Sequence, residues 1–163
     1  MSFSRKRETM ADTFGFDAKE LRILRGLNTP RKVQDFLNGT PINFEKEGDT
    51  CFSPRFVLKK RRAQCMEGAM FAAAALRFHG FSPLVVDLEA VSRDLDHVVA
   101  VFQIDGKWGA ISKTNHAVLR YREPIYASVR ELAMSYFHES FTDDGLKTLR
   151  AYSTPIDLSR FDK

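Results

Sequence analysis

The chain is poor in the residues that mark several protein classes. It has two cysteines, Cys51 and Cys65, among 163 residues, which is too few for a disulfide framework. No apolar run reaches the ~18 residues that a membrane helix needs. Residues 1–12 are polar and lack the apolar core of a signal peptide. The sequence therefore predicts a cytoplasmic protein with two free thiols and no membrane association.

Charge and ligand spacing exclude further classes. The 25 Lys and Arg against 21 Asp and Glu give a formal net charge of +4, and a dedicated nucleic-acid binder is more basic than this. The nine glycines are scattered, so there is no glycine-rich phosphate loop. Short paired ligand spacings such as Cys-x-x-Cys are missing. We expect no cofactor, no metal ion and no nucleic-acid partner, whereas the small positive surplus suits a negatively charged substrate. The oligomeric state is not predicted.

The rest of the composition is that of an ordinary globular domain. It is 44% hydrophobic and 28% charged, with 14 Phe to fill a core. No repeat or linker divides it, so we expect one domain over residues 1–163, with 1–12 flexible.

Capping residues and hydrophobic spacing predict the elements of this domain. Helices are expected over residues 18–26, 30–37, 65–79 and 128–137, with short helices from Pro54 and around 146–152. Strands are expected over 84–88, 97–104 and 107–112, with a short edge at 119–122. The helix that begins at Cys65 is apolar nearly all round, which indicates burial. The prediction is an α+β fold in which this helix packs on an antiparallel sheet of three or four strands, flanked by N- and C-terminal helices.

Cys65 is the first candidate site residue. At a helix N-terminus, free N–H groups and the helix dipole stabilise a thiolate. The basic run at residues 59–62 would add positive potential, while Glu67 would oppose it if its carboxylate pointed at the sulfur. The alternative is that Cys65 is a small buried hydrophobe, as most free cysteines are. Cys51 has no nearby base and is interpreted as structural.

His97 is the second candidate, at the start of a strand. Asp105-Gly106 predicts a two-residue hairpin turn, and the resulting register places Ser112 diagonally across from His97. Thr114 would lie opposite His97 if pairing continued. A hydroxyl can bond one imidazole nitrogen and leave the other free as a base. A structural histidine at a strand end is the alternative.

The order of these motifs resembles the transglutaminase-like (papain-like) superfamily of cysteine hydrolases and acyltransferases. The resemblance rests on residues 65–69, 96–101 and 105–108, and it covers about residues 54–114. The continuation Trp-Gly-Ala-Ile-Ser-Lys is similar to an uncharacterised bacterial branch. The resemblance implies that Cys65 is a nucleophile and His97 its general base, acting on an amide or peptide bond through an acyl-enzyme.

One position departs from the family pattern. The family's aspartate, four residues past the tryptophan, is replaced by Ser112, which cannot stabilise an imidazolium by charge. Ser112 remains the candidate orienter of His97, with Asn115 as the alternative. The backbone N–H of Cys65 is expected to bind the oxyanion, and Gln64 is a candidate second donor. Two functions lead: a Cys-His hydrolase or acyltransferase, or a catalytically weak scaffold that binds a peptide or an anionic partner. A third and weaker alternative, a nucleic-acid-associated protein, rests only on the basic run at residues 59–62.

Overall fold

The computed structural model describes residues 14–162, so the expected flexibility of residues 1–12 lies outside the described residues. The helices in this part of the chain are α1 (Ala18–Gly26), α2 (Pro30–Asn38), α3 (Pro54–Lys60), α4 (Cys65–Phe78) and α5 (Val129–Phe137). The strands are β1 (Leu84–Ala90), β2 (His97–Ile104), β3 (Lys107–Ile111), β4 (Arg122–Tyr126), β5 (Leu149–Tyr152) and β6 (Ile156–Asp157). Two short 3₁₀ helices are η2 (Ala117–Leu119) and η3 (Leu158–Phe161).

Side-chain caps start the helices where the sequence predicts them. Asp17 and Glu20 form a capping box at α1, and Thr29 caps α2 just before the proline that fits the first helical position. At α4 the cap is Gln64, which forms a capping box with Glu67. The first residue of α4 is therefore Cys65.

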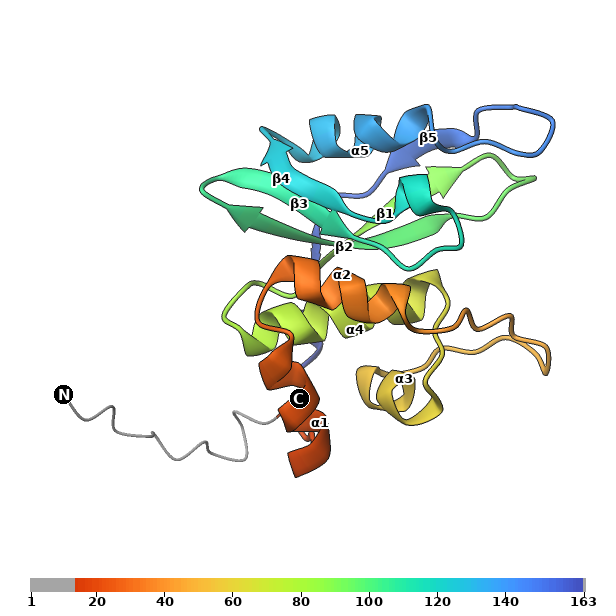
Figure 1. Ribbon diagram of the computed structural model, residues 1–163. Helices are drawn as coiled ribbons and strands as arrows, with labels where there is room; N and C mark the ends of the chain where they lie inside the picture. Colours follow the sequence, from red (N-terminus) through yellow and green to blue (C-terminus); the bar gives the residue numbers. More distant parts are fainter. Residues whose placement is uncertain (1–13, 163) are drawn as a thin grey trace.

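The sheet is antiparallel, with the strand order β4-β3-β2-β1-β5 and β6 paired with β1 (Figure 1). The predicted hairpin register is confirmed, because Ile104 pairs with Lys107 and Ala100 pairs with Ile111. The first residue after the last paired position of β3 is Ser112.

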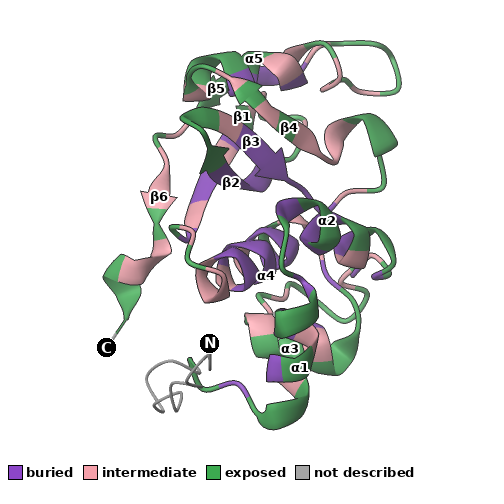
Figure 2. Cartoon of the chain, turned by 60° about the vertical axis from the view of Figure 1, so that its left-hand side comes forward, coloured by how far each residue is buried: buried purple, intermediate pink, exposed green. Residues whose placement is uncertain are grey.

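Helices cover both faces of this sheet, so the fold is mixed α+β. One core lies between the sheet and the N-terminal helices, and includes Val98, Ala100 and Phe102 of β2. The other lies beneath α5 and includes Val99 and Val101. Figure 2 shows α4 as the most completely buried helix. The predicted central helix packed on an antiparallel sheet is confirmed.

The edges of the sheet differ from the prediction. The short helix expected around residues 146–152 is wrong, because residues 149–152 form β5, which pairs with β1. The short edge expected at 119–122 is instead β4, which follows η2. The apolar spacing near Leu149 fits a helix locally, but the open edge of β1 supplies backbone partners that a local pattern does not reveal. The sheet therefore has six strands instead of three or four.

Candidate functional site

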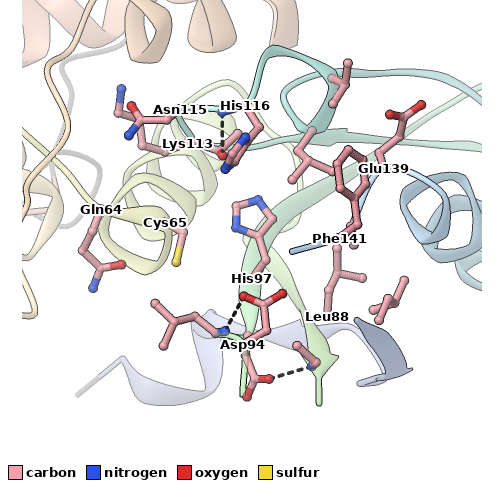
Figure 3. A pocket seen from close by; sticks show the side chains of 18 of the residues that line it. Gln64, Cys65, Leu88, Asp94, His97, Lys113, Asn115, His116, Glu139 and Phe141 are labelled. Carbon is pink, nitrogen blue, oxygen red and sulfur yellow. Dashed lines mark hydrogen bonds between the residues drawn. The ribbon is translucent and has the colours of Figure 1, made fainter. Parts of the chain in front are cut away.

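Segments far apart in the sequence meet at one end of the sheet and enclose a pocket of about 550 Å³ (Figure 3). They are the start of α4, the start of β2, the chain that leaves β3, and the chain after α5. Both Cys65 and His97 line this pocket. The fold thus brings together the two principal residues that the sequence singled out.

Cys65 is half-buried, whereas Cys51 is exposed and lies outside the lining of this pocket. In Figure 3 the Cys65 sulfur and the His97 ring both project into the pocket. Within residues 14–162 no hydrogen bond joins the thiol to the imidazole. Such bonds are often long in a free enzyme and shorten when substrate binds.

His97 is held through its Nε2 atom, which lies 2.5 Å from the Ser112 hydroxyl oxygen. Burial lowers the pKa of His97 to about 4, with a further lowering from His116. The imidazole is therefore neutral at pH 7. Asn115 lines the pocket but is exposed, and within the described chain Ser112 is the side chain that bonds the His97 ring. Thr114 does not pair opposite His97, because β3 ends at Ile111.

Ser112 is itself fixed by Gln34 of α2. The Gln34 side-chain amide donates to the Ser112 carbonyl at 2.9 Å, and the Ser112 N–H donates to the Gln34 side-chain oxygen at 2.9 Å. Gln34 is 1% exposed and lies 78 residues before Ser112. The sequence does not predict this contact, because a glutamine inside an amphipathic helix carries no local signal of its partner.

Lys113 anchors the next residue of the same segment. Its ammonium donates to the carbonyl of Leu37 at 2.9 Å and to the carbonyl of Thr40, both at the end of α2. Its Cβ packs against Gly68 of α4. Burial lowers the pKa of Lys113, with a contribution from Arg120. Although Lys113 lines the pocket, its charge is engaged by these carbonyls.

The Glu67 carboxylate makes its hydrogen bonds to groups other than the Cys65 thiol. The carboxylate is fully buried and faces the loop between α2 and α3. Burial raises its pKa, but hydrogen bonds to the charged form outweigh burial, so the pKa of Glu67 is lowered overall. The donors are the Thr50 hydroxyl at 2.6 Å, the Phe52 N–H at 2.9 Å, the Gln64 N–H at 2.9 Å and the Asn43 amide at 3.1 Å.

Gln64 lines the pocket next to Cys65 (Figure 3). Its side-chain oxygen accepts the Met66 N–H at 2.7 Å. The oxygen is thus occupied by the helix cap, which leaves the amide nitrogen as the group that can donate to a ligand.

The pocket lining is acidic. Its carboxylates are Asp94, Asp96, Glu139 and Asp143, and its one lysine is Lys113. None of the basic residues 59–62 lines this pocket: Lys60 and Arg62 line a neighbouring pocket of about 470 Å³, which shares Ile42 and Phe44 with it. The local charge is therefore opposite in sign to the net charge of the chain.

Metal-ligating side chains do not gather in groups of three or more anywhere in residues 14–162. None of the helices in this range has the length and hydropathy of a bilayer span. No protein-family model matches the chain, and the search of curated proteins finds no similar sequence.

Proposed function

We propose that the protein is a thiol-dependent hydrolase or acyltransferase that cleaves an amide or ester bond through an acyl-enzyme on Cys65. The observation that carries this proposal is the shared pocket: the cysteine at a helix N-terminus and the oriented histidine of β2 project into one cavity. The order of these residues, with the hairpin that follows, supports membership of the transglutaminase-like superfamily.

The proposed reaction uses His97 as a neutral base. When the Nε2–H donates to Ser112, Nδ1 keeps its lone pair and accepts the Cys65 proton. The thiolate attacks the carbonyl carbon, and the oxyanion is bound by the Cys65 backbone N–H, which has no partner within the helix. The imidazolium protonates the leaving nitrogen or oxygen as its bond to carbon breaks. Water or an amine then attacks the thioester carbon and gives a proton to His97. As the carbon–sulfur bond breaks, the imidazolium returns that proton to the Cys65 sulfur, and the acid or the new amide leaves.

The lining favours a particular substrate charge. Four carboxylates surround the pocket, and Lys113 is held by backbone carbonyls. A substrate with a neutral or positively charged group beside its carbonyl fits this lining better than the anionic substrate suggested by the net charge.

A binding module is the second candidate function. Ser112 replaces the acid that would stabilise the imidazolium, and burial disfavours a charged His97. Both features slow catalysis without closing the pocket. In this case a peptide would bind at the same site without covalent chemistry.

The decisive experiment compares the two cysteines in one sample. Iodoacetamide alkylation of Cys65 and Cys51 is followed by peptide mass spectrometry from pH 5 to pH 9. In an enzyme, Cys65 reacts faster than Cys51 below pH 8, and His97→Ala slows Cys65 by about a hundredfold or more, which is the lower end of the range for losing a general base.

His138→Ala is the matched control, because His138 is an exposed histidine outside the lining of this pocket. It should leave the Cys65 rate nearly unchanged. Equal, slow rates at both cysteines, with no effect of His97→Ala, would reject the enzyme and favour the binding module.

A further inference from the structure

Ser112 occupies an unusual place in the sheet. The ladder between β2 and β3 ends at Ile111, and β4 pairs with β3 only as far as Ala110. Ser112 therefore lies beyond regular strand pairing, yet it is completely buried and its hydroxyl bonds His97. A buried backbone segment without strand partners needs other groups for its N–H and C=O.

Gln34 provides both of those groups. Its amide oxygen and nitrogen bond the N–H and the C=O of the same residue, Ser112, each at 2.9 Å. The side chain thus replaces a neighbouring strand. These two bonds fix the orientation of the amide, because only its oxygen accepts and only its nitrogen donates. The nitrogen also donates to Asn38 at 2.9 Å.

We propose that Gln34 is a positioning residue of the candidate site, fixing Ser112 so that the serine hydroxyl holds His97 in a single tautomer. This inference rests on the proposed function, since the tautomer matters only if His97 acts as a base toward Cys65. Gln34 does not line the pocket, and it acts through Ser112.

The location of Gln34 strengthens the assignment. Lys113 is bonded to the carbonyl of Leu37 in the last turn of α2 and to that of Thr40 just after it, so α2 and its C-terminal end anchor two consecutive residues of the segment. Gly68 of α4 allows the same segment to approach that helix closely at Lys113. The position of the serine hydroxyl is therefore set by α2 and α4 together.

The test measures the His97 ring nitrogens directly. In the ¹⁵N-labelled full chain at pH 7, long-range ¹H–¹⁵N correlation should show one tautomer with Nε2 protonated. Gln34→Met removes both bonds to Ser112 at similar side-chain volume, and should move both nitrogen shifts toward values typical of exchanging tautomers. The Cys65 alkylation rate should fall by about tenfold, as expected for a misplaced catalytic group.

Asn38→Ala is the matched control, because it removes the other partner of the Gln34 amide and leaves Ser112 bonded. It should preserve the wild-type shifts and rate. Ser112→Ala should reproduce the Gln34→Met signature, and the double variant should show no further loss of rate, because both changes act on one contact. Gln34→Asn, which is one methylene shorter, serves as a second variant if Gln34→Met does not fold.

Wild-type nitrogen shifts in a folded Gln34 variant would overturn the inference, as would rate losses that simply multiply in the double variant. Failure of the proposed function has a different signature. In that case the Cys65 alkylation rate is the same in wild type and His97→Ala, while the nitrogen shifts still report whether Gln34 controls the tautomer of His97.

Discussion

At the scale of single residues, burial decides the charge of His97. Desolvation is the largest influence on this imidazole, and its one hydrogen-bonded side-chain partner in the described chain is a neutral hydroxyl. The pKa is lowered to about 4, so the His97 imidazole is uncharged at pH 7. An acid in place of Ser112 would stabilise the imidazolium and raise this pKa.

Acid should therefore destabilise the fold through His97. The unfolded histidine binds its proton near pH 6.5, while the folded one does so only near pH 4. The unfolded state binds more protons in this window, so stability falls as the pH drops from 7 to 4, by on the order of 3 kcal/mol. Urea unfolding of wild type and His97→Gln at both pH values isolates this contribution as a difference.

The same titration is visible by NMR. The His97 Cε1 proton should keep its shift from pH 8 to pH 5 and move only near pH 4. A midpoint near 6.5 for His97, together with an equal pH dependence of stability in wild type and His97→Gln, would contradict the prediction.

At the scale of elements, local signals could be predicted from the sequence and distant partners could not. The Asp105-Gly106 turn fixes the β2–β3 register within a few residues, so the proximity of Ser112 to His97 was predicted and is confirmed. The strand character of residues 149–152 depends on pairing with β1, and the role of Gln34 depends on a partner 78 residues away. Nothing in the local sequence specifies either contact.

Replacing Gly68 of α4 with alanine should destabilise the protein, which is the reverse of the usual effect of this change in a helix. Alanine in a helix interior normally stabilises by about 1 kcal/mol relative to glycine. A Cβ at Gly68 would lie 2.3 Å from the Cβ of Lys113, which cannot move without shifting the backbone next to Ser112. Gly68→Ala should therefore lower the free energy of unfolding by about 2 kcal/mol, measured by urea unfolding, and slow Cys65 alkylation.

Gly26 offers the matched control at the end of α1. A Cβ there meets nothing within 4 Å, so Gly26→Ala should leave stability unchanged or slightly higher. If Gly68→Ala also stabilised the protein, the close approach of α4 to the segment at Lys113 would not constrain the site.

At the scale of the whole molecule, net charge and local charge point in opposite directions. The chain carries a formal charge of +4, and part of its basic surplus, Lys60 and Arg62, lies on a pocket that excludes Cys65. The Cys65 pocket is lined by four carboxylates. At physiological salt, screening limits the range of interactions between exposed charges to about 8–10 Å. The charges of the pocket lining should therefore decide which charged molecules approach the thiol.

Charged thiol reagents test this directly, with Cys51 as the internal reference for intrinsic reactivity. A trimethylammonium methanethiosulfonate and a sulfonate methanethiosulfonate each form a mixed disulfide and release methanesulfinate. At low salt, the cation-to-anion rate ratio should be at least about fivefold larger at Cys65 than at Cys51, and should shrink in 0.5 M salt. The double variant Glu139→Gln, Asp143→Asn should reduce the cation-to-anion rate ratio at Cys65. Glu47→Gln, in the other pocket, should leave the ratio at Cys65 unchanged. A ratio at Cys65 equal to or below that at Cys51 would mean that the positive net charge governs the site, and a cationic substrate would lose its support.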